Sequence, residues 1–461
     1  MITGRHLLTR SLGEKSFFKS KYHLYFSQYM YIKLSITRLM RLPLIKKELL
    51  ISSLGNTIEW FDLGLFIFMA PIIGAQFFPQ EPTGKATIAA FIVFAAGFLC
   101  RPLGGIIFGY FGDTFGRAKT LRVSILIITL STFLIGVIPS FEKIGVIATV
   151  LFLLLRLIQG LSIGGEYSGI MIYLAESASN NKRGFITSFA ATGANLGFLL
   201  ATATLMLLHY FFTEDSIKSW VWRLPFLFIG LFGSLIIYYR FKLTETLVYS
   251  QLQKDHLIKS LPFIAAIKFA PSQLLKILGL TCMSSSFYYI FVGYMPTYLE
   301  HYIGFSFSDA LTMQSLLLTV LLFTVPLAGL CGDYFTRKKM LIINIIAIIF
   351  LILPCFYLLQ TKAQSLVLLS LGITTILSSF DQGNTLTAIV ENCPLNVRYS
   401  GIAFSYNLGN ALFGGTAPLM VSLLIKEIGL VAPAYYLIVM AIISFITATT
   451  LLKNNQSLGP L

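Results

Sequence analysis

Charged residues are scarce in this chain. Asp, Glu, Lys and Arg make up only 11% of its 461 residues, hydrophobic residues make up 56%, and the mean hydropathy is +0.80. Soluble domains carry about a quarter charged residues, so the composition excludes a soluble globular protein. The alternating pattern of barrel strands is also absent, so segments that cross a membrane must be helices, which satisfy their own backbone groups.

Cysteine and histidine are also few, with five of each. The cysteines are scattered without paired spacing, which favours small apolar side chains over a disulfide, redox or metal device. An enzyme inside the membrane would need a nucleophile with a base, or metal ligands, at one depth. No cluster of His or Cys falls at mid-membrane, so we expect neither an enzyme nor a cofactor or metal site.

Long apolar stretches are what the chain does have. About twelve of them reach the roughly 20 residues needed to cross a bilayer core as a helix. They fall at 50–76, 86–111, 120–139, 144–175, 184–211, 221–240, 274–299, 308–331, 340–360, 364–390, 399–425 and 430–452. The predicted fold class is therefore an all-α membrane protein with twelve transmembrane helices.

The net charge of +15 is distributed unevenly along the chain. Lys and Arg gather in alternate loops, at 112–122, 176–183, 240–276 and 332–339, whereas the opposite loops carry single cations. This positive-inside pattern predicts that both termini face the cytoplasm, in a cell inner (plasma) membrane. It explains the basic charge without nucleic acid, which we do not expect as a partner.

One stretch occurs twice. Residues 109–119 read GYFGDTFGRAK and residues 329–339 read GLCGDYFTRKK, so six positions agree at an offset of 220. Glu176 precedes Arg183 by seven residues, and Glu391 precedes Arg398 by seven. The chain therefore consists of two homologous halves, a common construction in transporters.

The duplication predicts a domain organisation. Two six-helix bundles are expected, joined by a polar cytoplasmic loop and flanked by a basic N-terminal extension and a short tail. The extension is interpreted as a segment lying on anionic lipid, with a transit peptide or a true start at Met40 as alternatives. The boundaries are 1–48 for the extension, 49–240 and 274–453 for the bundles, 241–273 for the loop and 454–461 for the tail.

The repeated turn suggests a conformational role. Its glycines allow helix ends to pack closely, and Asp113 and Asp333 can accept hydrogen bonds from a helix N-terminus or pair with Arg117 and Arg337. Such charge clamps can hold one access state and release in another; the alternative is that the cations only fix topology. The candidate gating residues are Gly109, Gly112, Asp113, Gly116, Arg117, Glu176, Arg183, Asp333, Arg337, Glu391 and Arg398.

Polar residues from different helices converge at one depth. At about 1.5 Å per residue, Glu166 lies about 15 Å from Glu176, near the middle of the membrane. Ionisable groups at that depth are costly and favour a functional site. Structural ion pairing is the alternative role for Glu59, Asp62, Arg101 and Glu166. Arg156 and Arg223 instead fall toward the outer interface, where we expect them to snorkel. The candidate residues for solute binding and proton coupling are Glu59, Asp62, Arg101, Glu166, Tyr167, Asn195, Tyr288 and Asp381.

Less specific roles are open for part of this set. Asn195 can make a plain interhelical hydrogen bond, and Tyr288 can serve packing alone. No histidine lies near mid-membrane, so a coupling proton must be carried by a carboxylate of Glu59, Asp62, Glu166 or Asp381. On this hypothesis, Glu166→Gln and Asp62→Asn abolish uphill uptake.

Several motifs resemble those of a known family. The repeated turn looks like the signature loop of the major facilitator superfamily, and other segments resemble its metabolite:proton symporter branch, with proline/betaine transporters most similar. The resemblance implies a twelve-helix bundle that cotransports a small polar metabolite with protons by alternating access. Two departures are Thr336, where the family usually has Gly, and Asp381, where an apolar residue is expected. The motifs are NTIEWFD at 56–62, RPLGG at 101–105, QGLSIGGEY at 159–167, WRLPF at 222–226, YMPTYL at 294–299, RYSG at 398–401 and PAYY at 433–436.

The expected solute follows from the charges of the candidate site. More carboxylates than cations suit a zwitterion, whose carboxylate meets Arg101 while its cationic end meets acidic and aromatic groups, among them Trp60, Tyr167, Tyr288 or Tyr289. An organic acid such as 2-oxoglutarate, citrate or shikimate is the alternative solute, and a transport-inactive membrane sensor the alternative class. The expected partners are a small solute, a proton and the lipid bilayer, for a monomeric protein.

Overall fold

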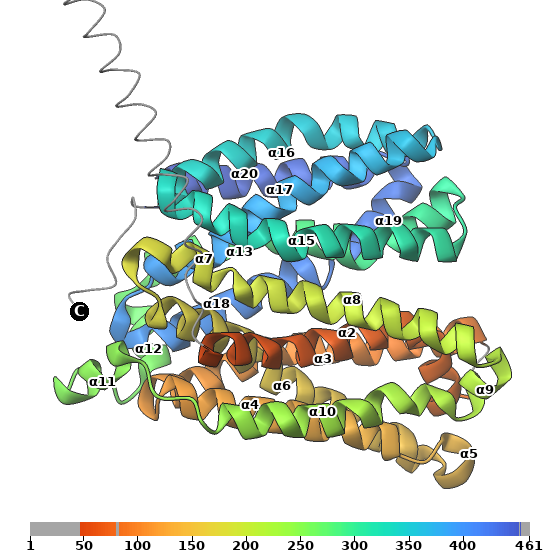
Figure 1. Ribbon diagram of the computed structural model, residues 1–461, viewed down its shortest axis with the longest axis horizontal. Coiled ribbons are helices and arrows are strands. Elements are labelled where there is room, and N and C mark those ends of the chain that lie inside the picture. Colours follow the sequence, from red (N-terminus) through yellow and green to blue (C-terminus); the bar gives the residue numbers. More distant parts are fainter. Residues whose placement is uncertain (1–46, 80–82, 451, 453–461) are drawn as a thin grey trace, which may run out of the picture. The chain divides into compact units, whose positions relative to one another are not determined.

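The structure is a computed structural model that describes residues 47–79, 83–450 and 452. The predicted N-terminal extension lies outside the described residues, apart from Lys47 and Glu48 at the start of the first helix. The predicted tail, 454–461, lies outside them as well. The described part of the chain consists of helices and the turns between them (Figure 1).

The first half of the chain supplies the helices drawn from red to yellow-green in Figure 1, most of which lie in its lower part. Their bounds are α2 (Lys47–Phe77), α3 (Thr83–Thr114), α4 (Arg117–Val137), α5 (Phe141–Ile144), α6 (Val146–Ser177), η1 (Asn180–Lys182), α7 (Arg183–Thr187), α8 (Phe189–Phe211), α9 (Glu214–Ser219), η2 (Val221–Arg223) and α10 (Leu224–Arg240). Two short helices follow in the connecting segment, α11 (Leu247–Lys254) and α12 (Pro262–Phe269).

The second half supplies the remaining helices. Their bounds are α13 (Pro271–Tyr288), η3 (Tyr289–Tyr294), α14 (Met295–Tyr298), η4 (Leu299–Ile303), α15 (Phe307–Phe335), α16 (Arg337–Gln360), α17 (Gln364–Glu391), η5 (Leu395–Val397), α18 (Arg398–Gly409), η6 (Asn410–Gly414), α19 (Ala417–Ile428) and α20 (Ala432–Thr450).

Twelve helical stretches in the described residues are long and apolar enough to cross a membrane. They agree closely with the predicted runs: the run predicted at 364–390, for example, is the span Gln364–Glu391. The prediction of an all-α protein with twelve transmembrane helices is therefore confirmed. The exact domain boundaries stay a prediction.

The spans of the two halves pack against one another. Helix α8 packs against α15, and α3 packs against α18. At the end of α15, Gly329 and Gly184 approach so closely that a side-chain carbon on either would collide with the carbonyl oxygen of the other. Glycine is required there because only a residue without a side chain allows two helix backbones to come this near.

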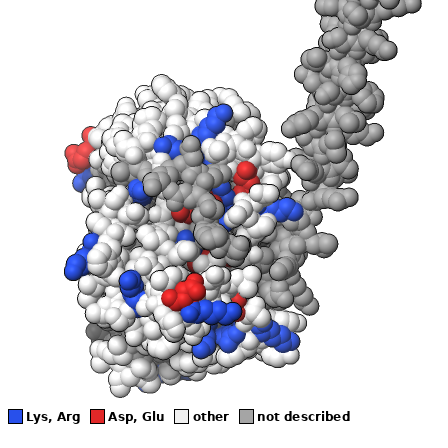
Figure 2. All heavy atoms as spheres, turned by 90° about the vertical axis from the view of Figure 1, so that its left-hand side faces the viewer, with Lys and Arg blue, Asp and Glu red and all other residues white. Residues whose placement is uncertain are grey.

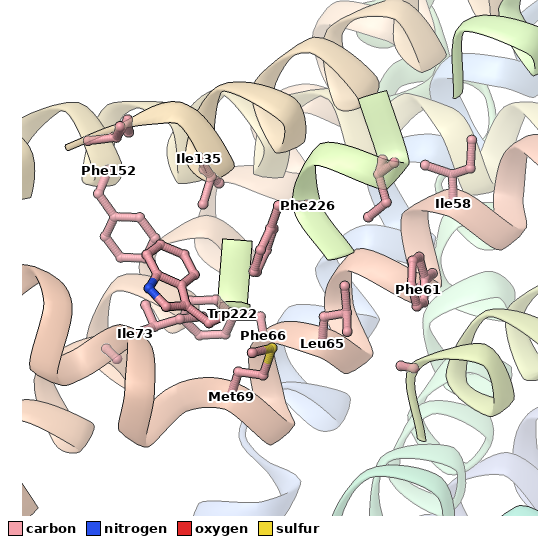
Figure 3. Packing of buried hydrophobic residues seen from close by; sticks show 14 of the residues in the cluster. Ile58, Phe61, Leu65, Phe66, Met69, Ile73, Ile135, Phe152, Trp222 and Phe226 are labelled. Atoms are coloured by element: carbon pink, nitrogen blue, oxygen red, sulfur yellow. The ribbon is translucent and has the colours of Figure 1, made fainter. Parts of the chain in front are cut away.

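A hydrophobic cluster fixes α2 within the first half. The rings of Phe77 and Phe152 stack with centroids 4.5 Å apart, and Trp222 packs edge-on against Phe77. Figure 3 shows Trp222 and Phe226 reaching from the start of the sixth span toward Phe66 of α2. This packing holds in place the helix that carries the Glu59–Asp62 segment.

The repeated turn ends α3 and α15 with the same backbone geometry. Gly116, between α3 and α4, has φ of 113°, and its counterpart Thr336, between α15 and α16, has φ of 77°. Glycine adopts this region freely, but a β-branched residue is strained in it. Thr336 therefore differs from the glycine that is usual in the family by its side chain, while its backbone keeps the positive φ of Gly116.

Replacing Thr336 with glycine is expected to stabilise the protein. A non-glycine residue in this region costs about 1–3 kcal/mol, and the flexibility that glycine adds to the unfolded chain offsets about 0.5–1 kcal/mol of the gain. We expect Thr336→Gly to raise the apparent melting temperature in detergent by about 1–3 °C. The matched variant Gly116→Thr should lower it, since its side chain would also meet Glu245. Equal melting temperatures for Thr336→Gly and the parent would show that this turn is unstrained.

Candidate functional site

An aromatic cavity lies between the two halves. The cavity is narrow in this structure: its free volume is about 20 Å³, room for about one water molecule. The first half contributes Trp60 from α2 and Tyr167 from α6, and the second half contributes the rest of the wall. The residues from the second half are Ser284, Ser285, Tyr288, Tyr289, Gln382, Leu386, Tyr406 and Asn410.

The aromatic rings of this cavity hold one another in place. Trp60 meets Tyr167 and Tyr288 edge-to-face, with centroids 5.5 and 5.2 Å away, and Tyr167 stacks on Tyr406 at 5.5 Å. The hydroxyl of Tyr288 is buried and has no hydrogen-bond partner among the described residues. The cavity therefore presents aromatic rings together with an unused polar group, a surface suited to a small organic cation.

One charged residue of each half lies next to this cavity, behind a residue that lines it. In the first half, Arg101 donates from Nη1 to the hydroxyl of Tyr289 over 3.4 Å, and its guanidinium stands 3.7 Å above the centre of the Phe98 ring. No carboxylate among the described residues lies within ion-pairing distance of Arg101. In the second half, Ser284 donates to Asp381 over 2.5 Å, and Thr385 donates to the other oxygen of that carboxylate over 3.0 Å.

Glu59 is a buried carboxylate without a direct partner. It is 1% exposed, and neither oxygen accepts a hydrogen bond from any described residue. The charged groups that act on it electrostatically include the cationic Arg101 and Arg240 and the anionic Glu166. An unpartnered carboxylate in a buried position is unfavourable when charged, so Glu59 is suited to taking up a proton.

Asp62 has a direct counter-ion. Arg156 donates to it from Nη1 over 2.8 Å, and both side chains are buried. The expectation that Arg156 snorkels to the outer interface is therefore wrong: counting residues along a helix estimates depth but not which face the side chain occupies. Asp62, Arg156 and Arg101 line a second hollow, also with a free volume of about 20 Å³.

Glu166 also has a direct counter-ion. Arg240 lies 2.9 and 2.5 Å from its two oxygens, and Ser124 donates to it over 2.5 Å. Arg240 ends α10, at the first position of the basic loop 240–276, yet its side chain is fully buried. The pair neutralises Glu166, which does not line the aromatic cavity.

Asn195 connects the two halves. Its amide nitrogen donates to Gln382 of α17 over 2.9 Å, and Gln382 lines the aromatic cavity while Asn195 does not. Arg223 is half-buried and donates to the carbonyl of Ile138. Of the eight candidate site residues, the structure places only Tyr167 and Tyr288 in the cavity wall, and Arg101 and Asp381 directly behind it.

The candidate gating residues form two clamps at the end of the molecule that carries the repeated turns. This end is viewed in Figure 2. In the first clamp, Asp113 accepts the backbone N–H groups of Tyr399 and Ser400 at the N-terminus of α18, over 3.1 and 2.9 Å. Arg117 lies 3.3 Å from Asp113 and 3.4 Å from Glu176. Arg398 of the second half completes the clamp, 3.0 Å from Glu176.

The second clamp repeats the first with the halves exchanged. Asp333 accepts the N–H groups of Gly184 and Phe185 at the N-terminus of α7, over 2.8 and 2.9 Å. Arg337 lies 2.8 Å from Asp333 and 3.2 Å from Glu391. Arg183 of the first half lies 2.8 Å from Glu391. A helix N-terminus attracts a carboxylate, so each clamp joins the halves by charge and by hydrogen bonds.

Comparison with known proteins identifies the family. The family model described as Major Facilitator Superfamily matches residues 52–418. The chain belongs to the major facilitator superfamily. The glycine betaine/proline/ectoine/pipecolic acid transporter OusA of Dickeya dadantii is 35% identical over 87% of this chain and 82% of its own length. The proline/betaine transporter of Escherichia coli K12 is 33% identical over 88% of this chain and 83% of its own length.

Solved structures agree with this assignment. The proton:xylose symporter XylE bound to 6-bromo-6-deoxy-D-glucose superimposes on this major facilitator protein with a TM-score of 0.70 at 18% identity. The match covers 87% of this chain and 94% of XylE. The family resemblance inferred from the sequence motifs, including the similarity to proline/betaine transporters, is confirmed.

Sequence reasoning about this major facilitator protein missed Glu245. Its carboxylate, in the segment after α10, accepts the N–H groups of Arg117 and Ala118 at the start of α4, over 3.0 and 3.1 Å. The neighbouring Thr246 donates to Glu176 of the first clamp over 2.8 Å. Glu245 stands 128 residues from Arg117 in the chain, and no motif marks it, so only the folded structure connects the two.

Proposed function

We propose that this major facilitator protein takes up a small zwitterionic solute of the proline/betaine type together with a proton, by alternating access to the aromatic cavity. The observation that carries the proposal is the cavity itself. It lies between the halves, is walled by aromatic rings that suit a cationic nitrogen, and has Arg101 beside it for a carboxylate. The names of the relatives support the same class of solute.

Glu59 is our candidate for the proton carrier. Asp62 and Glu166 each have an arginine counter-ion that stabilises their charged form, whereas Glu59 has no ion-pair partner among the described residues and is influenced by Arg101 and Arg240 from a greater distance. When Glu59 takes up a proton, Arg101 loses part of its compensating negative charge and attracts the carboxylate of the solute more strongly. When solute and proton have left, Arg101 and the ionised Glu59 compensate each other again. Proton and solute therefore travel together.

In this proposal the two clamps close and open one end of the protein during the transport cycle. While they are closed, the end with the repeated turns is sealed, and release of both opens it. The excess of Lys and Arg in the loops at this end supports its placement on the cytoplasmic side of the plasma membrane. The protein then works as a monomer, is not an enzyme and uses no cofactor, the proton serving as the coupling ion.

An organic acid is the second candidate solute. The second hollow is lined by both Arg101 and Arg156, and two guanidinium groups at one site favour a dicarboxylate. Among the described residues, Asp62 is the one carboxylate that lines this hollow, and it pairs with Arg156 but not with Arg101.

Uptake into proteoliposomes with an imposed proton gradient tests the proposal. We expect accumulation of labelled proline or glycine betaine that collapses when a protonophore is added, and inhibition by the other zwitterion but not by 2-oxoglutarate. Liposomes without protein are the control. Inhibition by 2-oxoglutarate alone would favour the organic acid. Equal solute accumulation with and without the proton gradient would contradict symport.

A further inference from the structure

Asp381 differs from every other buried carboxylate that the structure describes. Asp62, Asp113, Glu166, Glu176, Asp333 and Glu391 each lie within 4.0 Å of an arginine, and Glu59 is influenced by Arg101. Asp381 is 2% exposed and has only hydroxyl partners, Ser284 and Thr385. A buried negative charge requires compensation, and within the described residues no cation provides it.

The position of Asp381 shows where a compensating charge can enter. Ser284 lies between Asp381 and the aromatic cavity, because its hydroxyl donates to Asp381 and its side chain lines the cavity wall. A serine oxygen that donates its one proton keeps two lone pairs free to accept. A cationic N–H group in the cavity can therefore donate to Ser284 and interact with the charge of Asp381 behind it.

Arg101 and Asp381 also come from different halves of the chain. Arg101 contacts the cavity through Tyr289, and Asp381 contacts it through Ser284. A zwitterion between them has its carboxylate directed at the first half and its ammonium at the second. Such a solute brings in the positive charge that Asp381 lacks, whereas an organic acid brings in none.

From this arrangement we propose that Asp381 and Ser284 form a recognition site for the protonated nitrogen of the solute, which selects zwitterions with an N–H group. The proposal rests on the proposed function, since it assigns one end of the same solute. Primary and secondary ammonium groups, as in proline, use both the hydroxyl of Ser284 and the charge of Asp381. A quaternary ammonium has no N–H to donate and uses the charge and the aromatic rings alone.

The test compares proline and glycine betaine in two variants. Ser284→Ala should raise the KM for proline about tenfold, the loss expected for one hydrogen bond near a charge, and leave the KM for glycine betaine within about twofold. Asp381→Asn should raise both KM values at least about tenfold. Ser286→Ala is the matched control, because this neighbouring serine of α13 is buried, contacts the carbonyl of Phe413 and does not line the cavity.

The outcomes separate this proposal from the proposed function. Equal changes for the two solutes in Ser284→Ala, or no change in either, would overturn the recognition site while leaving zwitterion symport intact. Loss of uphill uptake in Asp381→Asn with unchanged affinity in solute exchange would also overturn it, because Asp381 would then carry the proton. If the parent protein transports neither zwitterion, both proposals fail. If Asp381→Asn does not fold, as judged by size-exclusion chromatography, the KM values of Ser284→Ala for proline and glycine betaine still test the recognition site.

Discussion

Glu59→Gln is expected to abolish uphill accumulation of solute while exchange of internal for external solute continues. Glutamine keeps the size of the side chain and resembles the protonated acid, so the solute still binds beside Arg101. It cannot release a proton, however, so the proton gradient no longer drives the cycle. We expect the accumulation ratio to fall from well above one to about one, because solute then only equilibrates across the membrane.

Proteoliposomes with and without a proton gradient provide this measurement, and exchange of preloaded solute provides its complement. Glu142→Gln is a matched control, since Glu142 is exposed in the short helix α5 and lines neither the aromatic cavity nor the second hollow. If Glu59→Gln still concentrates solute, the proton is carried by another group.

The paired carboxylates give a contrasting result in the same assay. Glu166→Gln leaves Arg240 buried without its counter-ion, and Asp62→Asn does the same to Arg156. Removing one partner of a buried pair costs about 3–5 kcal/mol of stability. The sequence-based prediction that these two variants lose uphill uptake stays a prediction; we expect the loss to be accompanied by a lower yield of folded protein, which Glu59→Gln should not show.

The features that could be predicted from the sequence are local or repeated ones. Length and apolarity identify each span. The duplicated turn identifies Asp113 and Asp333 as equivalent positions of the two halves, because the same residues recur at one offset. Depth along a helix could also be estimated, which placed Glu59 and Asp381 at mid-membrane together with Asp62, Arg101 and Glu166. Each of these inferences uses residues that are close in the chain or aligned between its halves.

The pairing of buried charges could not be predicted in this way. Arg156 and Asp62 lie 94 residues apart, and Arg240 and Glu166 lie 74 apart. Which side chains meet depends on how α2, α6 and α10 are rotated about their axes, and helices that are apolar all round give little periodicity from which to read that rotation. The same uncertainty concealed the contribution of Tyr406 to the cavity.

Breaking both clamps is expected to open the end of the molecule that carries the repeated turns. Glu176 and Glu391 each lie between one arginine of each half. In the double variant Glu176→Gln/Glu391→Gln, these arginines lose the negative charge that holds the halves together. We expect the open state to gain population and concentrative uptake to fall more than about tenfold, because the state that is closed at this end, and can load solute from the other side, becomes rarely populated.

Cys393 reports this opening directly. It is buried beside the first clamp, where Arg398 donates to its carbonyl oxygen over 3.2 Å, and burial raises the pKa of its thiol to about 12. Because only the thiolate is alkylated, the closed protein should react slowly at pH 8, and its rate should keep rising tenfold per pH unit beyond pH 9. In the open state the pKa of the thiol returns toward its ordinary value, so alkylation at pH 8 should accelerate on the order of 10²–10³-fold. The alkylation rate should also reach its plateau at a lower pH than in the closed state.

The alkylation experiment uses a background in which Cys100, Cys282, Cys331 and Cys355 are replaced by alanine, so that Cys393 is the only thiol. Glu427→Gln is the control, since Glu427 is exposed near the end of α19 and belongs to neither clamp. Single variants should give intermediate rates, because the second clamp still holds the halves. If the double variant loses transport while Cys393 reacts as slowly as in the parent, the clamps do not control access at this end, and the two charge networks must be assigned to stability alone.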